Sequence, residues 1–422
     1  MTRGLSASGP LLLRPIALLR PVVLLRPVAL LRPVVLLRPV VLVALATVAL
    51  GLACSGKSKP DDTPAEDGGN NGSSDAGDVV QPDAAPAPVA RLMYISTGNG
   101  QRLAVARLEV DGTITRLAGR DVTVAGNTGA LAYARSTRRL YLGVGTGIAT
   151  FTLDAQGTPS AAGTTGGTGT PVYLATARND SLLISAYFGD DRLRVHDVSG
   201  AAPHGELHAL DVADEPHASF AGPGVGPGER VYVPHRTGNT TQWFSITDVG
   251  NGGRQLVLDD QLTAPAGAGP RHIAFTPDGR FAYVINEFAD SVTAHSVAAD
   301  GSLTALETVT TLPAGADGAS NTCADVHVTP DGRTLYGSNR GHDSIAMFSI
   351  AGDGRLTPLG HVATEPRPRE FEVSPDGRFV VVAGQDSGFV QSYAVAADGS
   401  LTAVSGAGRL DIGGDLRWVI IE

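Results

Sequence analysis

Two arginines and a glutamate stand in two similar stretches of this sequence, and their side chains suit anion binding and proton transfer. One stretch, GPRHIAFTPDGRFAYVINEFAD from Gly269, contains Arg271 and Glu287, and the other, TCADVHVTPDGRTLYGSNRGHD from Thr322, contains Arg340. A guanidinium can hold a carboxylate or a phosphate, and a carboxylate can take a proton from a bound molecule. If the fold brings these three side chains together, they form a site that binds an anion and moves a proton.

A predicted β-hairpin in each stretch explains how such residues could meet. Two apolar runs flank a Pro-Asp-Gly turn, and residues equidistant from the turn of an antiparallel pair face each other. This geometry places Arg271 opposite Asn286 and Glu287, at the strand ends away from the turn. Similar hairpins add further candidates, which are Arg340 opposite Cys323 and Ala324, Arg369 opposite Gly384 and Gln385, and His217 near His235. A single arginine after a strand is commonly a solvated loop residue, so the prediction depends on the convergence of the set.

The hairpin is repeated along the chain, and the period of the repeat predicts the fold. Six copies begin at residues 129, 170, 215, 269, 322 and 367, which is a spacing of 41 to 54 residues. Each copy continues into a third apolar run and another turn, as in the four-stranded blades of a β-propeller. A seventh blade can combine RLMYISTGNG from Arg91 with LRWVIIE at the C-terminus, which closes the ring. We therefore expect an all-β, seven-bladed β-propeller over residues 89–422 whose N- and C-terminal strands share one blade.

Residues 1–53 have the character of a signal peptide with a basic leader of Arg-Pro repeats. A proline at every sixth residue opposes a regular helix, and an uninterrupted apolar run follows from Val40 to Ala53. This run is shorter than the ~20 residues of a spanning helix. It ends in LGLACSG, which resembles a bacterial lipoprotein signal with Cys54 as the lipidated residue. We expect export and lipid anchoring at the outer membrane or in the periplasm, with cleavage without a lipid or a retained membrane anchor as alternatives.

The rest of the chain is acidic. Residues 54–88 are rich in Asp, Gly, Ser and Pro and hold almost no large apolar side chains, so they predict a disordered acidic linker. The net charge is −10 although residues 1–53 contribute six arginines and no acidic residue. Nucleic acid is therefore not an expected partner, and contact with a membrane is expected only through the N-terminal lipid.

Cysteines and possible metal ligands suggest chemistry without a cofactor. Only Cys54 and Cys323 are present, so lipidation of Cys54 would leave no internal disulfide. Cys323 opens a predicted strand without a basic neighbour, and we expect it to be a buried thiol rather than a nucleophile. No cluster of histidine, cysteine and carboxylate residues at metal-binding spacing is apparent, and we interpret Asp325, His327 and His342 as structural.

The sequence from about residue 215 to 422 resembles the seven-bladed lactonase family, which includes propeller-type 6-phosphogluconolactonases and fungal carboxymuconate-lactonising enzymes. The phrases GPRHIAFTPDGRFAYVINE, ADVHVTPDGRTLYGSNR and PREFEVSPDGRFVVVAGQ support this resemblance. Arg271, Glu287 and Arg340 match positions implicated in the family's site, and His217 matches its histidine. The segment GPGVGPGE replaces the usual Pro-Asp-Gly turn near His217. Residues 89–214 resemble the family only in the spacing of the predicted blades.

The resemblance implies hydrolysis of a small lactone at the channel mouth, and we expect the substrate to be an anionic sugar lactone or muconolactone and the protein to be a monomer. Arg271 and Arg340 would bind the acidic substituent and the oxyanion, and Arg369, His235 and Gln385 would complete the binding site. Either Glu287 or His217 would be the general base, and we prefer Glu287 because an opposing arginine keeps it ionised. We expect Arg340, at the rim, to contribute little to stability. The alternative is a non-catalytic, surface-anchored propeller that binds a sugar, a peptide or an envelope partner.

Overall fold

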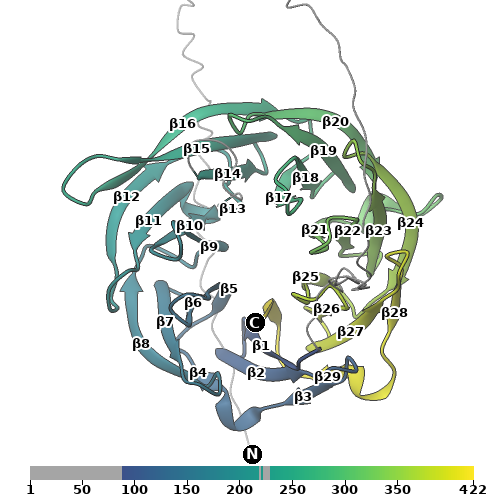
Figure 1. Ribbon diagram of the computed structural model, residues 1–422, viewed down its shortest axis with the longest axis horizontal. Helices are drawn as coiled ribbons and strands as arrows, with labels where there is room; N and C mark the ends of the chain where they lie inside the picture. The colour runs from purple at the N-terminus through teal and green to yellow at the C-terminus, as the bar shows by residue number, and fades with distance from the viewer. Residues whose placement is uncertain (1–87, 218–219, 222–228) are drawn as a thin grey trace, which may run out of the picture. The chain divides into compact units, whose positions relative to one another are not determined.

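Antiparallel sheets follow one another around a ring in the computed structural model, which describes residues 88–217, 220–221 and 229–422 (Figure 1). The predicted signal peptide, Cys54 and nearly all of the predicted linker lie outside the described residues. Within the described part there are seven sheets and no α-helix, which confirms the seven-bladed β-propeller. No helix in that part is long and apolar enough to cross a membrane.

We number the blades from 1 to 7 in chain order and name the strand nearest the channel first in each blade. Blade 1 consists of β30 (Leu416–Ile421), β1 (Arg91–Thr97), β2 (Arg102–Leu108), β3 (Ile114–Arg116) and β4 (Val122–Thr123); blade 2 of β5 (Thr128–Ala134), β6 (Arg139–Val144), β7 (Gly147–Leu153) and β8 (Pro159–Gly166); blade 3 of β9 (Tyr173–Ala177), β10 (Leu182–Tyr187), β11 (Arg192–Asp197) and β12 (Gly205–Asp211). Blade 4 consists of β13 (Phe220–Ala221), β14 (Arg230–His235), β15 (Thr240–Asp248) and β16 (Arg254–Thr263); blade 5 of β17 (Pro270–Phe275), β18 (Phe281–Asn286), β19 (Ser291–Val297) and β20 (Leu303–Thr310). Blade 6 consists of β21 (Cys323–Val328), β22 (Thr334–Asn339), β23 (Ser344–Ile350) and β24 (Leu356–Ala363); blade 7 of β25 (Pro368–Val373), β26 (Phe379–Gly384), β27 (Phe389–Val395), β28 (Leu401–Ala403) and β29 (Arg409–Asp411). Four short 3₁₀ helices join them, η1 (Ala118–Arg120), η2 (Phe188–Asp190), η3 (Gly318–Ser320) and η4 (Gly406–Gly408).

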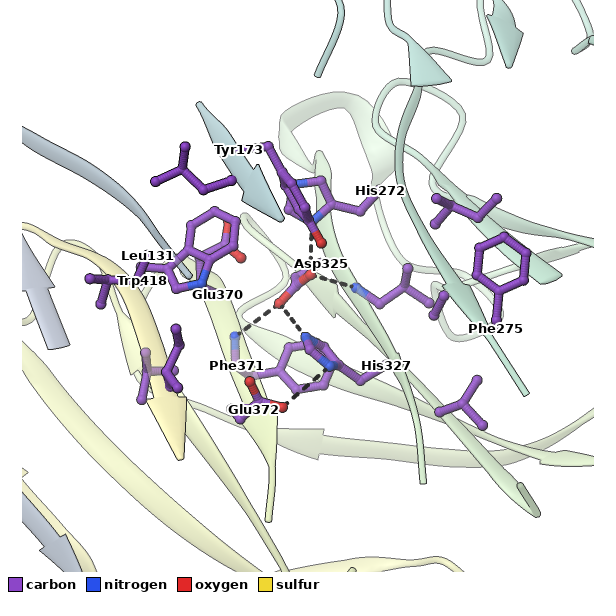
Figure 2. A pocket seen from close by; sticks show the side chains of 17 residues that line it. Leu131, Tyr173, His272, Phe275, Asp325, His327, Glu370, Phe371, Glu372 and Trp418 are labelled. Carbon is purple, nitrogen blue, oxygen red and sulfur yellow. Dashed lines mark hydrogen bonds and ion pairs between the residues drawn. The ribbon is translucent and has the colours of Figure 1, made fainter. Parts of the chain in front are cut away.

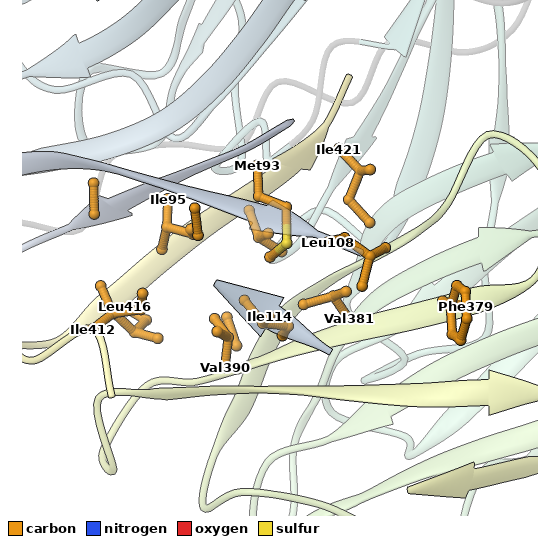
Figure 3. Packing of buried hydrophobic residues seen from close by; sticks show 14 residues of the cluster. Met93, Ile95, Leu108, Ile114, Phe379, Val381, Val390, Ile412, Leu416 and Ile421 are labelled. Atoms are coloured by element: carbon orange, nitrogen blue, oxygen red, sulfur yellow. The ribbon is translucent and has the colours of Figure 1, made fainter. Parts of the chain in front are cut away.

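The two ends of the described chain close the ring, as the sequence predicts. β30 pairs with β1 in antiparallel register, for example Tyr94 with Ile420. Apolar side chains of blades 1 and 7 then pack into one buried cluster that includes Met93, Ile95 and Val381 (Figure 3). Because the closing blade takes strands from both ends, opening the ring would expose this cluster as well as two sheet edges.

The turns of the repeated phrase have the hydrogen bonds that their residue types predict. In the TPDG turn of blade 5, Thr276 Oγ1 donates to Asp278, whose Oδ1 also accepts from the backbone of Arg280. Gly279 has a φ of 69°, a left-handed conformation that favours glycine. The same turn recurs in blades 6 and 7. It sets the hairpin register and thereby determines which residues reach the far ends of the strands.

A second repeated feature joins neighbouring blades. The hydroxyl of Tyr283 in blade 5 donates to the carbonyl of Gly354 in blade 6 at 3.0 Å, and Tyr336 in blade 6 donates to Gly399 in blade 7 at 2.8 Å. Each glycine lies in the outer turn of its blade and has a positive φ. The bonds fix the position of each blade relative to the next, and so fix how the channel residues of neighbouring blades meet.

Candidate active site

The residues at the channel mouth come from equivalent places in successive blades. Arg236, Glu287 and Arg340 are each the first residue after the second strand, β14, β18 and β22 respectively. Because the three blades are neighbours in the ring, their strand ends lie side by side (Figure 1). The fold thus collects side chains that are far apart in the sequence.

β-Bulges add a second set of residues from the innermost strands. Pro270 pairs with Asn286 and His272 with Ile285, so Arg271 is the extra residue of a bulge. The sequence placed Arg271 directly opposite Asn286 and Glu287, which is one residue out of register. Arg369 occupies the same position in blade 7, between paired Pro368 and Glu370. A bulge turns the extra side chain away from the regular alternation, here toward the channel.

Glu287 is the centre of the mouth cluster, which we define as Glu287 with Arg236, Arg271 and Arg340. Arg340 Nη2 donates to Glu287 Oε1 at 2.7 Å, and Arg236 Nη1 lies 3.5 Å from the same oxygen. The Nε of Arg271 lies 3.6 Å from Glu287 Oε2. Among the described residues, no hydrogen bond reaches this second oxygen, although it is buried. One carboxylate oxygen is therefore left for another proton donor.

The charge of this carboxylate follows from two opposing effects. Burial favours the neutral acid, but the positive charges of Arg271 and Arg340 outweigh it and lower the pKa of Glu287 below its usual range. Glu287 is thus ionised at neutral pH. An anion that enters the mouth would offset the charge of the neighbouring guanidinium groups and make Glu287 a stronger base.

Arg271 and Arg340 are buried rather than exposed at a rim. Arg271 has no solvent-exposed surface, donates to the carbonyl of Ala324, and lies 3.4 Å from Glu370 through Nη2. Arg340 is 6% exposed and also donates to the carbonyl of Cys323 at 2.9 Å. The expected rim position of Arg340 is therefore wrong, and we now expect a larger contribution to stability, because its removal would take the side-chain donor from the carbonyl of Cys323 and leave Glu287 Oε1 with Arg236 alone, at 3.5 Å.

His217 lies beside the mouth cluster as a neutral imidazole. Its side chain is buried, with the ring 5.7 Å from that of Phe188 and 5.4 Å from that of His272. Burial and the nearby charge of Arg271 hold the pKa of His217 well below its usual range. Its Nδ1 has no hydrogen-bond partner among the described residues. This nitrogen is a second possible proton acceptor in the same region.

Two predicted binding residues have other surroundings. His235 is buried and its Nδ1 pairs with the carbonyl oxygen of Ala213 at 2.7 Å, while its backbone bridges to Pro216. Gln385 follows β26, and its backbone amide donates to the carbonyl of Arg367. Neither side chain makes a described contact with the mouth cluster. The structure therefore brings Arg271, Glu287 and Arg340 together, places His217 beside them, and does not bring in His235 or Gln385.

A pocket of about 340 Å³ lies deeper in the channel, one residue further along the innermost strands (Figure 2). Asp325 stands at its centre, with Oδ1 2.8 Å from His272 Nδ1 and Oδ2 3.0 Å from His327 Nε2. The same carboxylate accepts from the backbone amides of Val326 and Phe371. Asp325 thus has the structural role that the sequence suggested, and with His327 it also lines a cavity.

The ionisable groups of this pocket have strongly shifted pKa values. Burial opposes the charge of His327, but Asp325 outweighs it and raises the pKa of His327 to about 9. Burial raises the pKa of Glu372 to about 7, and the Nδ1 of His327 lies 3.7 Å from this carboxylate. Burial also raises the pKa of Glu370 well above its usual range. At neutral pH the pocket therefore holds an ionised Asp325 and a protonated His327.

The Asp325 and His327 pair predicts a loss of stability at alkaline pH. An unfolded histidine releases its proton near pH 6.5, whereas folded His327 keeps it to about pH 9, so the stabilisation is complete below 6.5 and disappears as the pH rises through 9. Urea denaturation at about pH 7.5 and about pH 9.5 should show a larger loss for the wild type than for His327→Gln. The difference between the two proteins in lost unfolding free energy should stay below about 1.4 kcal/mol per pH unit, because the side chain of His327 is 29% exposed. An identical pH dependence in both proteins would contradict the assignment.

Three of these residues also form a set of possible metal ligands, which the sequence did not reveal. Ligand atoms of His272, Asp325 and Glu370 lie within 4.8 Å of one another. However, His272 uses Nδ1 for Asp325, and its Nε2 lies 3.1 Å from a guanidinium nitrogen of Arg271. The same guanidinium lies beside Glu370. Arg271 already supplies the positive charge at this place, so the set does not suit a metal ion.

The chain matches a family of known proteins over most of the propeller. A family described as "Lactonase, 7-bladed beta-propeller" matches residues 93–411. The chain belongs to this lactonase family. The match begins at residue 93, so it includes the first blades, where the sequence showed only the spacing of the repeat.

Individual relatives agree with this membership. A 6-phosphogluconolactonase of Pectobacterium carotovorum is 31% identical over 287 residues, which cover 67% of this chain and 84% of that protein. A solved structure of a protein from Lactobacillus plantarum has 25% identity and a TM-score of 0.71 and covers 79% of this chain and 100% of its own. The periplasmic gluconolactonase of Pseudomonas aeruginosa has 22% identity and a TM-score of 0.69, with 79% and 99% coverage, and at that identity it shows the fold alone.

Arg236 was not among the residues predicted for this lactonase, although the sequence contains a signal for it. In VPHRTGN, Arg236 follows its strand as Glu287 does in VINEFAD and as Arg340 does in GSNRGHD. The prediction fell on His235, one residue earlier, because the irregular segment before it disturbed the alignment. In the structure the guanidinium of Arg236 stacks on the rings of Phe188, at 4.5 Å, and Phe288, at 5.1 Å. These contacts hold the cation over the mouth.

Proposed function

We propose that this lactonase-family protein hydrolyses a small lactone with an anionic substituent at the arginine-lined mouth of its channel. Family membership and the 6-phosphogluconolactonase relatives make it a lactone hydrolase. The observation that supports the mouth as the place of reaction is the mouth cluster. There a buried, ionised Glu287 lies between three guanidinium groups, and one of its oxygens has no hydrogen bond among the described residues. Such a set can accept a proton while it stabilises negative charge.

In this proposal Glu287 is the general base. Its Oε2 takes a proton from water as the water oxygen attacks the lactone carbonyl, and the carbonyl oxygen becomes an oxyanion. The positive field of Arg236 and Arg340 favours that oxyanion over the neutral carbonyl. When the ring C–O bond breaks, the leaving oxygen receives the proton from Glu287, and the product is a hydroxy acid. His217, whose Nδ1 is also without a partner among the described residues, is the alternative base.

The charge of the mouth supports an anionic substrate. Arg236, Arg271 and Arg340 share Glu287, and Arg236 also pairs with Glu215 at 2.9 Å, while Arg271 also lies beside Glu370. Burial raises the pKa of Glu370 well above its usual range, so this third carboxyl contributes little negative charge. The described pairs thus leave an excess of positive charge in a protein whose net charge is −10. A local positive region in an acidic protein attracts a small anion to that place.

A hydrolysis screen tests this function. The purified protein is assayed against neutral sugar lactones, phosphorylated sugar lactones and muconolactones, with ring opening followed by acid release. We expect the highest kcat/KM for an anionic lactone, because the mouth favours negative charge in both the bound substrate and the oxyanion. Absence of turnover across the whole panel would contradict the proposal.

We also propose that the protein is exported and anchored to the cell envelope by a lipid on Cys54. The support comes from the sequence alone, namely the apolar run up to Ala53 and the LGLACSG motif. A tethered propeller of this kind would act on lactones outside the cytoplasm.

A further inference from the structure

The channel mouth is filled on one side and open on the other. In blades 4 to 6 the residue after the second strand is Arg236, Glu287 or Arg340, whereas in blades 1 and 2 it is Gly98 or Gly145. A pocket of about 220 Å³ lies on the open side. Its lining includes Gly98, Thr128, Gly129, Pro171, Arg369 and Arg417. Small residues at these places leave a space that two arginines border.

Arg369 borders this pocket without a counterion. Among the residues that the structure describes, no hydrogen bond or ion pair is formed by its guanidinium, although the side chain is only partly exposed. Burial, followed by the charge of Arg271, lowers the pKa of Arg369 below that of an ordinary arginine. Arg340 and Arg417 act in the same direction, and the one opposing neighbour, Glu370, has a raised pKa and so contributes little negative charge. A guanidinium in such surroundings is stabilised by a bound anion.

Arg417 provides the second cation of the pocket. It occupies the bulge of β30, opposite the register shift between Ser96 and Thr97 of β1. Its Nη2 pairs with Asp415, while its buried Nε has no hydrogen-bond partner among the described residues. A Cβ on Gly98 would lie 2.6 Å from that Nε, so the glycine at this place permits the approach of the arginine. Asp415 is thus the only carboxylate, among the described residues, that forms an ion pair with either of the two guanidinium groups.

We infer that Arg369 and Arg417 form a subsite that binds the anionic group of the substrate, a phosphoryl or carboxylate group, beside the mouth cluster. This inference rests on the proposed function and names the part of the site that selects charged over neutral lactones. Arg271 and Arg340 are less suited to this role, because the Nη groups of Arg271 face the carbonyl of Ala324 and Glu370, its Nε lies 3.6 Å from Glu287, and Arg340 donates to Glu287 and the carbonyl of Cys323. Arg369 has its donors available, and planar guanidinium groups bind the oxygens of phosphate and carboxylate in pairs.

The test compares the wild type with Arg369→Met and Arg417→Met on two substrates that differ only in charge, gluconolactone and its 6-phosphorylated form. Arg369→Met should lower kcat/KM for the phosphorylated lactone by about 10-fold to 150-fold, which is the range for losing a hydrogen bond to a charged group. The change should appear as a higher KM. The value for neutral gluconolactone, which has no anionic group for this subsite, should fall much less. Arg367→Met is the matched control, because Arg367 is two residues away, exposed, and paired with Asp386 outside the pocket.

Direct binding separates this inference from the proposed function. Inorganic phosphate is titrated into the folded wild type and each variant by calorimetry, with the fold checked by circular dichroism. Phosphate binding that Arg369→Met weakens at least about 10-fold and that Arg367→Met retains supports the subsite, even if the wild type hydrolyses neither lactone. Unchanged phosphate binding in Arg369→Met, no phosphate binding by the wild type, or an equal loss of activity on both lactones would overturn it.

Discussion

Glu287→Gln is expected to reduce kcat by about 100-fold or more while the protein still binds an anionic lactone. Glutamine keeps the size of the side chain and one oxygen for Arg340, but its amide cannot accept the proton of the attacking water. The Oε2 of Glu287, buried 3.6 Å from Arg271 Nε, is the atom that the substitution removes from proton transfer. Steady-state kinetics on the best lactone of the screen, with substrate affinity measured separately, gives the result.

A neighbouring carboxylate provides the control for this experiment. Glu215 also pairs with Arg236, at 2.9 Å, but makes no described contact with Arg271 or Arg340, so Glu215→Gln should retain most of the activity. If His217→Asn abolishes turnover while Glu287→Gln keeps it, the base is His217 rather than Glu287. If both variants remain fully active, the mouth cluster is not the catalytic site.

Arg271→Met is expected to lower the free energy of unfolding by about 3 to 5 kcal/mol, the range for removing one partner of a buried ion pair. Arg271 is fully buried between Glu287 and Glu370 and also donates to the carbonyl of Ala324. Methionine fills much of the volume but removes the donor to the carbonyl of Ala324 and to Glu370, and it takes one of three positive charges away from Glu287, in a place that water does not reach. The loss should therefore exceed that of a surface arginine by several-fold.

Arg280→Met is the matched surface substitution. Arg280 pairs with Asp278 at 2.6 Å, but its side chain is 64% exposed, and such pairs contribute about 0 to 1 kcal/mol. Urea denaturation of both variants at neutral pH measures the contrast. Equal, small losses in the two proteins would show that Arg271 is not an internal bridge between the two carboxylates.

The fold could be predicted because the same short-range sequence patterns specify each blade in turn. Alternating apolar residues predict the strands, and the TPDG and SPDG turns fix each hairpin, as the hydrogen bonds of Asp278 confirm. The period of the repeat predicts a ring, and the closing pair of β1 and β30 follows from the short apolar run at the C-terminus. These are short-range signals, so no knowledge of distant contacts was needed.

Part of the site could be predicted for the same reason. Equivalent places in repeated hairpins converge in a ring, which brings Glu287 and Arg340 together across two blades at 2.7 Å. The bulges could not be predicted, because an extra residue leaves no mark in the apolar alternation until the partner strand is known. They decide that Arg271 lies against Glu287 and that Arg369 and Arg417 border a separate pocket.

The tertiary structure alone decided which charges neutralise one another. From the sequence, Arg271, Arg340 and Arg369 were three similar arginines, yet the first two are buried against Glu287, and of the three only Arg369 lacks an ion pair among the described residues. Likewise Asp325, His327 and Glu372 belong to two blades, and their shifted pKa values arise only where those blades face the same pocket. Burial and distance set these energies, and both depend on how the closed ring packs rather than on any local stretch of sequence.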